Sequence, residues 1–200
     1  MPASATERSP LTQPAAADTL LRFLNTHASG PRQLPERFAD ARTMHTWLQE
    51  QGLVTETTHV TEADAARARE LRDALITVLL AHAGDKTTTP EALARAEEQL
   101  RGISTRHPLT TVVTAAGASL AGTQTGIPGL FATVLASVTE LAHAGVWDRL
   151  RACRHAPCHF CFFDRTRNSS AGYCGPKCAS RASMRAYRQR RKEQATATAG

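Results

Sequence analysis

The sequence lacks the features of a secreted or membrane-spanning protein. Its first 17 residues contain no basic start followed by an apolar run, so no secretory signal is visible. The most apolar window, residues 127–146, contains Glu140 and His143 and has a one-sided helical period, which favours a buried helix over a membrane span. We therefore expect a cytoplasmic protein that does not contact a membrane and does not form disulfide bonds.

Cysteine is absent from the first 152 residues, and all five cysteines lie between positions 153 and 178. Cys158 and Cys161 have the spacing of an oxidoreductase motif, but no alternation of strand, helix and strand surrounds them. No other pattern resembles an active site, so we expect that the protein is not an enzyme.

Acidic residues are scarce in the C-terminal part of the chain. Residues 149–192 carry 12 Lys and Arg against one Asp, whereas residues 1–148 carry 12 Lys and Arg against 16 Asp and Glu. Such a local excess of positive charge attracts a polyanion, most often a nucleic acid. The two parts of the chain therefore have different partners.

The spacing of apolar residues predicts a mainly α fold with one small β-hairpin. Capping residues and the residues typical of helix ends place five N-terminal helices at about residues 18–24, 35–51, 61–83, 89–101 and 128–144. β-Branched residues followed by a glycine predict a hairpin over residues 109–123, and residues 146–151 continue as a helical turn. Residues 1–17 and 194–200 are small and polar, so we expect them to be disordered.

The cysteine-rich stretch is too short to be stabilised by a hydrophobic core of its own, so we expect a metal to hold it. Two close pairs of thiolates are the usual donors for one tetrahedral Zn²⁺. Cys174 and Cys178 form the second pair. The first pair is either Cys153 with Cys158 or Cys158 with Cys161, and spacing alone slightly favours the latter. His155 and His159 are imidazoles close by.

The stretch resembles the CGNR-type zinc fingers, which follow a mainly helical ABATE domain in bacterial proteins described as transcription regulators. The resemblance is carried by an ordered set of residues: Cys153, Cys158, Asp164, Thr166, Asn168, Tyr173, Cys174, Cys178 and Arg181. The signature Cys-Gly-Asn-Arg reads Cys178-Ala179-Ser180-Arg181 here, and Ser183 stands where a Lys is common. The N-terminal part is similar to the ABATE domain in layout, including Leu24-Asn25-Thr26 near the start.

This resemblance implies that zinc is bound by Cys153, Cys158, Cys174 and Cys178, and that Cys161 is not a ligand. It also implies a helical N-terminal domain over residues 18–145, which senses a small-molecule effector or mediates assembly. A small zinc finger with cysteine-bearing loops would follow over residues 146–193 and end in a basic helix. Within the finger, Asp164 is expected to shape the loop through hydrogen bonds to backbone N–H groups.

The basic helix is the candidate nucleic-acid interface. Arg181, Arg185, Arg188 and Lys192 recur at spacings of three and four, which places them on one side, and Arg190 and Arg191 are expected to widen that surface. We therefore expect a zinc-dependent DNA-binding transcriptional regulator. The alternative is a zinc-thiolate redox switch that binds a protein, in which oxidation of Cys161 ejects the metal.

Overall fold

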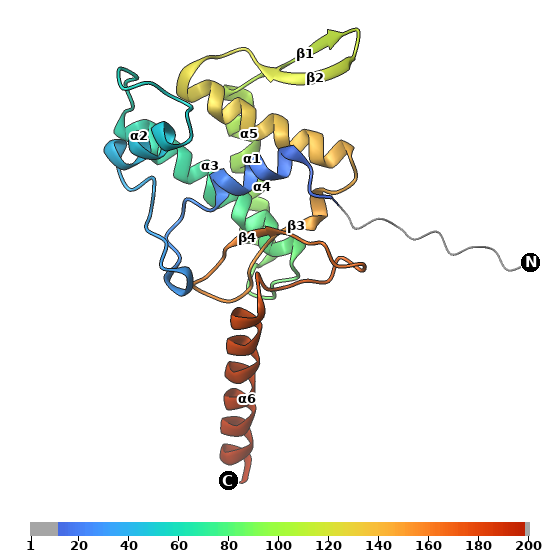
Figure 1. Ribbon diagram of the computed structural model, residues 1–200. Coiled ribbons are helices and arrows are strands. Elements are labelled where there is room, and N and C mark those ends of the chain that lie inside the picture. Colours follow the sequence, from blue (N-terminus) through green and yellow to red (C-terminus); the bar gives the residue numbers. More distant parts are fainter. Residues whose placement is uncertain (1–11, 199–200) are drawn as a thin grey trace, which may run out of the picture.

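The computed structural model describes residues 12–198, and it consists of a helical body from which one long helix projects (Figure 1). The predicted mainly α fold with a terminal helix is confirmed, and two small antiparallel hairpins accompany the helices. The elements follow in the order α1 (Ala15–Leu24), η1 (Gly30–Arg32), α2 (Ala41–Glu50), α3 (Glu62–His82), α4 (Pro90–Arg106), β1 (Leu109–Thr114), β2 (Gly117–Gly122), α5 (Gly126–His143), η2 (Trp147–Arg149), β3 (Leu150–Ala152), β4 (Cys161–Phe163) and α6 (Pro176–Thr198).

The core of the body forms where α1, α3 and α5 pack together, with α2 and α4 against α3. α3 buries one face along most of its 21 residues, including Leu71, Leu75 and Leu79. Phe38 lies between α1 and α2, with its ring centroid 5.6 Å from that of Phe23 and 5.2 Å from that of Trp47. These apolar contacts give the N-terminal elements one continuous core.

Capping residues and the conformation of Gly102 explain where the helix boundaries agree with the prediction and where they differ. At the start of α3, Thr61 accepts a hydrogen bond from the Asp64 N–H and donates its own N–H to the Asp64 carboxylate, as expected from their spacing. α2 begins at Ala41, six residues later than predicted, because the capping box is formed by Asp40 and Thr43. α4 continues through Gly102 to Arg106, since Gly102 keeps an ordinary helical conformation.

Both expectations of terminal disorder need correction where the structure describes the chain. α1 begins at Ala15, and Ala16 and Ala17 are buried against the core, so residues 15–17 are ordered. α6 continues to Thr198, which includes most of the second segment expected to be disordered. Residues 1–11 and 199–200 lie outside the described part of the chain.

The predicted hairpin over residues 109–123 is confirmed as β1 and β2, which pair from Leu109 opposite Gly122 to Thr114 opposite Gly117. Gly117 follows the turn with φ +145°, a conformation that favours glycine. Gly122 lies directly against Ala132 of α5, where a Cβ atom would clash. The hairpin therefore lies along α5 at one end and extends from the body at the other (Figure 1).

The helical turn expected over residues 146–151 is only partly correct. A 3-10 turn forms at Trp147–Arg149, but the chain then becomes β3, which pairs with β4 so that Leu150 lies opposite Phe163 and Ala152 opposite Cys161. These four side chains belong to the main hydrophobic core, and the His82 ring in α3 contacts the Leu150 carbonyl oxygen at 3.0 Å through Nδ1. The cysteine-rich region is therefore joined to the body by a shared core.

None of the helices in the described part of the chain combines the length and apolar composition needed to cross a membrane.

Because β3 is part of the main core, a defect in it should destabilise the helices as well. Leu150 is fully buried, and we expect Leu150→Ala to lower the free energy of unfolding by about 2–5 kcal/mol. Urea unfolding followed by far-ultraviolet circular dichroism measures this change. Leu53→Ala is the control, since Leu53 is 53% exposed. An unchanged helical transition in Leu150→Ala would show that the cysteine-rich region unfolds separately.

Candidate metal centre

Four of the five cysteines converge on one point. The Sγ atoms of Cys153, Cys158, Cys174 and Cys178 all lie within 4.8 Å of one another. The distance is 3.7 Å from Cys158 to Cys174 and 3.8 Å from Cys174 to Cys178. Tetrahedral Zn²⁺ with Zn–S bonds of about 2.3 Å separates its sulfur ligands by about 3.8 Å. The four thiols are therefore positioned to bind a metal ion, and both their number and their spacing are consistent with zinc.

The two sheet strands and α6 bring these cysteines together. Cys153 follows β3 and donates its N–H to the Phe160 carbonyl oxygen at 3.0 Å, which extends the pairing of β3 with β4. The chain turns back between these strands, and the Cys158 N–H bonds the His155 carbonyl oxygen within that turn. Cys174 precedes α6, and Cys178 lies in its first turn. The last two cysteines therefore hold the start of α6 against the loop.

Cys161 is not part of this group. It lies in β4, is 1% exposed, and packs with the main core. Its Sγ atom lies 3.6 Å from the His159 carbonyl oxygen. Spacing alone slightly favoured Cys158 and Cys161 as the first pair of ligands. Among the described residues, the structure instead places Cys153 beside Cys158 in the cluster. The run of apolar residues from Phe160 to Phe163 was the available sign that Cys161 belongs to a strand.

Burial of the cysteine cluster favours neutral thiols when no cation is present. It raises the pKa of Cys153 to about 11 and raises the pKa of Cys178 as well. Burial also opposes ionisation of Cys158, but the Phe160 N–H and the Ser29 hydroxyl, together with the neighbouring thiols, lower its pKa. Four thiolates in this space therefore require a central cation, and metal binding has to displace thiol protons.

Asp164 shapes the loop that follows β4, as expected. Its carboxylate accepts hydrogen bonds of 2.8 Å from the N–H groups of Thr166 and Ala171, and it lies 3.4 Å from Nε of Arg151. Burial opposes its ionisation, but the hydrogen bonds from Thr166 and Ala171 and the charge of Arg151 lower its pKa. The Thr166 hydroxyl then accepts the Ser170 N–H at 3.0 Å. These bonds position the chain that leads to Cys174.

Residues from the N-terminal body also reach the metal centre, which reasoning from the sequence did not anticipate. The Asn25 side chain pairs with the backbone of Cys161, accepting its N–H at 2.8 Å and donating to its carbonyl oxygen at 3.0 Å. His27 and Ser29 both contact the Cys158 carbonyl oxygen. The match at Leu24-Asn25-Thr26 was the one sequence signal that pointed to this contact.

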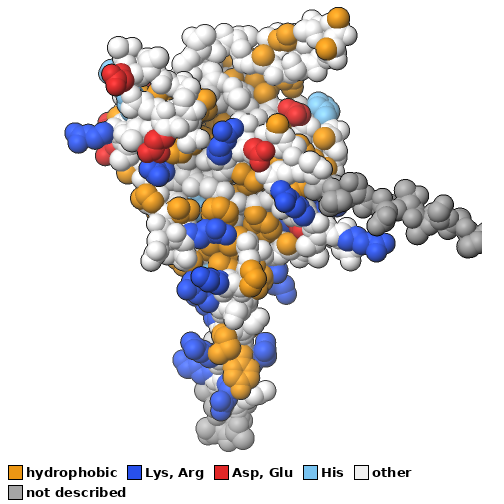
Figure 2. All heavy atoms as spheres, viewed as in Figure 1, with side chains coloured by type: hydrophobic (Ala, Val, Ile, Leu, Met, Phe, Trp, Pro, Cys, Tyr) orange, Lys and Arg blue, Asp and Glu red, His pale blue; other side chains and the backbone are white. Residues whose placement is uncertain are grey.

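α6 presents its basic residues to solvent. Arg181, Arg185, Arg188 and Lys192, which we call the basic stripe, are all exposed and lie along one side of the helix. Figure 2 shows Lys and Arg side chains along the projecting helix, whereas on this face the acidic side chains lie on the body. Successive residues of an α-helix are rotated by about 100° around its axis. Arg191 therefore lies beside the stripe, whereas Arg190 lies about 180° around the helix from Arg181. Arg190 therefore does not widen the stripe as expected.

The near end of the basic stripe lies close to the cysteine loop. His155, which is buried, has a lowered pKa because of its burial and, next, because of the positive charges of Arg185 and Arg181. Farther along the helix, Met184 and Tyr187 are about half exposed, at 49% and 50%. From residue 183 to residue 194 every residue of α6 is exposed.

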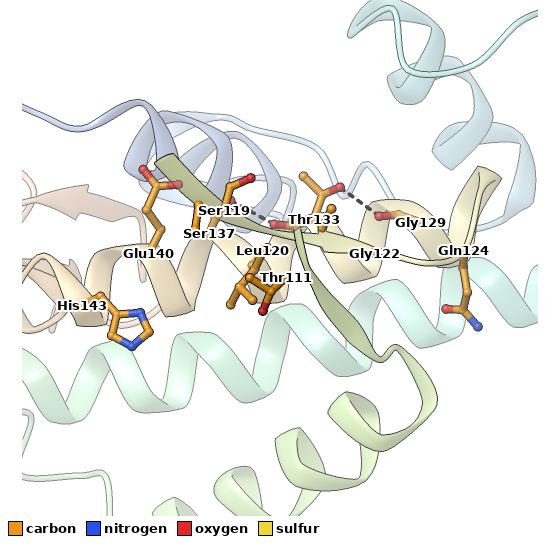
Figure 3. A pocket seen from close by; sticks show the side chains of 13 residues that line it. Thr111, Ser119, Leu120, Gly122, Gln124, Gly129, Thr133, Ser137, Glu140 and His143 are labelled. Carbon is orange, nitrogen blue, oxygen red and sulfur yellow. Dashed lines mark hydrogen bonds between the residues drawn. The ribbon is translucent and has the colours of Figure 1, made fainter. Parts of the chain in front are cut away.

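A separate hollow lies in the N-terminal body between the β1–β2 hairpin and α5 (Figure 3). Its volume is about 900 Å³. In Figure 3, Glu140 and His143 lie at one end and Gln124 lies at the other. Thr133 and Ser137, on the α5 side, donate their hydroxyl groups to backbone carbonyl oxygens of the same helix. The hollow is thus lined by both polar and small apolar groups, away from the cysteines.

Comparison with known families assigns both parts of the chain. A family model named ABATE, described as "Putative stress-induced transcription regulator", matches residues 17–152, which is more than half of the chain. A second, described as "CGNR zinc finger", matches residues 149–191. Both resemblances inferred from the sequence are thereby confirmed. No curated protein matches the chain.

The geometry of the cysteine cluster predicts which thiols control metal content. We expect one zinc per chain in the wild-type protein and in Cys161→Ala, and a large loss of zinc in Cys174→Ser, because only the second change removes a thiol from the cluster. Elemental analysis of the purified full-length proteins after dialysis measures this. Equal zinc content in the two variants would contradict the assignment.

Proposed function

The chain belongs to the ABATE family and carries a C-terminal CGNR zinc finger, and from that premise we propose that it is a zinc-dependent DNA-binding protein that regulates transcription. The proposed ligands are Cys153, Cys158, Cys174 and Cys178. The observation that carries the proposal is the position of α6, whose exposed basic stripe begins three residues after Cys178. We propose a binding role for the protein and no catalytic one.

The shape and charge of α6 support a nucleic-acid partner. Its 23 residues span about 34 Å, and an α-helix fits the major groove of B-form DNA. Lys177 and Arg191 flank the basic stripe at spacings that keep them next to it, so one side of the helix offers six positive charges. Contacts of Lys and Arg with phosphates position a protein on DNA and supply most of its salt-dependent affinity.

Zinc has a structural role in this proposal. Cys174 and Cys178 attach the first turn of α6 to the loop between β3 and β4, and the strands on either side of that loop are part of the core. When zinc is bound by all four thiolates, the helix start is linked to the body by covalent ligand bonds. Loss of the metal leaves α6 without this attachment, so we expect it to weaken DNA binding by disordering the start of the helix.

The N-terminal domain is the proposed regulatory part. A small-molecule effector stays a prediction, and the hollow between the hairpin and α5 is its candidate location. The hollow lies on α5, which leads through η2 directly into β3 and the first cysteine. A ligand that moved the end of α5 would therefore act on the chain that enters the metal centre.

The redox-switch alternative depends on Cys161 as a reactive thiol. Cys161 is 1% exposed, and its burial raises its pKa, so it is held as a protonated and inaccessible thiol. Reactive cysteines are thiolates that solvent can reach. The surroundings of Cys161 thus favour the DNA-binding proposal over the alternative.

A salt-titrated gel shift on the full-length protein tests the DNA-binding proposal. If the six basic residues of this side contact one phosphate each, the slope of log K against log salt is about −5, and affinity falls about 10³-fold between 50 and 200 mM salt. We expect Arg185→Ala to weaken binding to all duplexes and to reduce the slope by about 0.9, since one phosphate contact is lost.

Arg190→Ala is the matched control, because it removes the same charge from the opposite side of the same helix. We expect it to change the slope much less than Arg185→Ala does. Failure of the wild-type protein to bind any duplex at 50 mM salt would reject DNA as the partner. Equal effects of the two substitutions would reject the basic stripe as the interface.

A further inference from the structure

The segment over residues 25–34 connects α1 with α2 and lies against the metal centre. In Figure 1 it runs down from α1 to the chain of the cysteine loop. Ser29 and Leu34 pair as an isolated bridge, with N–H to carbonyl distances of 3.0 and 3.1 Å, and η1 forms the turn between them. Gln33 adopts a left-handed conformation that closes this turn. The backbone thereby holds Arg32 in a defined place.

Ser29 brings a hydroxyl group directly to one of the proposed ligands. It is fully buried, and its Oγ atom lies 3.1 Å from the Cys158 carbonyl oxygen and 3.8 Å from the Cys158 Sγ atom. The Nε2 atom of His27 lies 3.0 Å from the same carbonyl oxygen. Two side chains of the N-terminal domain therefore position Cys158, and one of them also reaches its sulfur.

Arg32 brings a positive charge close to the sulfur ligands of the metal centre. Its guanidinium carbon lies 3.6 Å from the centroid of the Phe160 ring, so the planar group stacks on the ring. Arg32 and Cys174 line the same hollow. Burial opposes ionisation of the guanidinium, but the thiols of Cys174 and Cys158 raise its pKa. Stacking leaves the N–H edge of the group available for hydrogen bonds. Arg32 thus faces two proposed ligands that come from different parts of the finger.

Zinc bound by four thiolates carries a formal charge of about −2, since four negative charges exceed the two positive charges of the ion. A cation and a hydroxyl donor beside the sulfur atoms lower the free energy of such a centre. Groups that hydrogen-bond to metal ligands typically change metal affinity by about 10- to 100-fold. Arg32 and Ser29 have the position that this effect requires.

We propose that Arg32 and Ser29 of the N-terminal domain are positioning residues for the metal centre, which set its zinc affinity by donating hydrogen bonds to the sulfur atoms of Cys158 and Cys174. The conformation of residues 25–34 and zinc occupancy are then coupled. Any change that withdraws this segment weakens zinc binding, and zinc binding in turn stabilises the segment. The proposal depends on the four-cysteine zinc site and is independent of DNA binding.

The zinc dissociation constant of the full-length protein tests the coupling. We expect Arg32→Gln to raise this constant about 10-fold in competition with a chromogenic zinc chelator at fixed pH and salt. Glutamine keeps a planar group over Phe160 but lacks the charge. We expect Arg32→Lys, which keeps the charge without the planar fork, to lie between the wild-type protein and Arg32→Gln.

Arg42→Gln is the charge-matched control, since Arg42 lies on α2 and is exposed. We expect it to leave the zinc dissociation constant within twofold of wild type. The melting temperatures of the zinc-loaded and zinc-free proteins separate positioning from ordinary packing. Arg32→Gln should lower the first and leave the second unchanged.

Two results would overturn the proposal. One is a zinc dissociation constant of Arg32→Gln within twofold of wild type. The other is an equal fall in melting temperature with and without zinc, which would assign Arg32 a purely structural role on Phe160. Failure of the wild-type protein to bind DNA, with zinc affinity still lowered in Arg32→Gln, would concern the proposed function alone, so the two failures are distinguishable.

Discussion

The metal centre and the attachment of α6 depend on the convergence of four sulfur atoms from three places in the chain. Cys153 follows a strand, Cys158 lies in a turn, and Cys174 and Cys178 flank the start of a helix. Buried thiols this close together favour their neutral forms, so only a bound cation allows all four to ionise. This requirement makes a metal ion part of the fold of the region.

The position of α6 is a consequence of that centre. Up to residue 194 the helix is exposed beyond the cysteine loop, and a helix with so little contact area needs a firm attachment at its first turn. Cys178 supplies this attachment when the metal is bound. Because the basic stripe begins within the next turn, the orientation of its charges follows from the geometry of the metal site.

The zinc finger is less independent of the N-terminal domain than its small size and distinct composition indicate. Its strands add Leu150, Cys161 and Phe163 to the main core, and Asn25 pairs with the Cys161 backbone. Ser29 extends this contact to the Cys158 sulfur atom, and Arg32 lies beside it over the Phe160 ring. An N-terminal domain that touches the metal ligands has a direct physical route to α6.

Periodicity and capping determined much of this protein from the sequence alone. The apolar face of α3, its Thr61–Asp64 capping box and the β1–β2 hairpin depend on residues close in the chain, so local patterns predicted them. The excess of Arg in the last part of the chain predicted a polyanion partner, and the resemblance implied that this part ends in a basic helix. Resemblance to a known finger indicated the four cysteines, which spacing alone did not separate from Cys161.

Only the tertiary structure decided the features that join distant parts of the chain. Cys161 is buried because β4 faces the core, and residues 25–34 reach the metal centre because α1 packs against β4. Neither fact leaves a periodic signal, since each depends on contacts across more than 100 residues. Local patterns record which face of an element is apolar, whereas the surface that face meets is set by the packing of the whole chain.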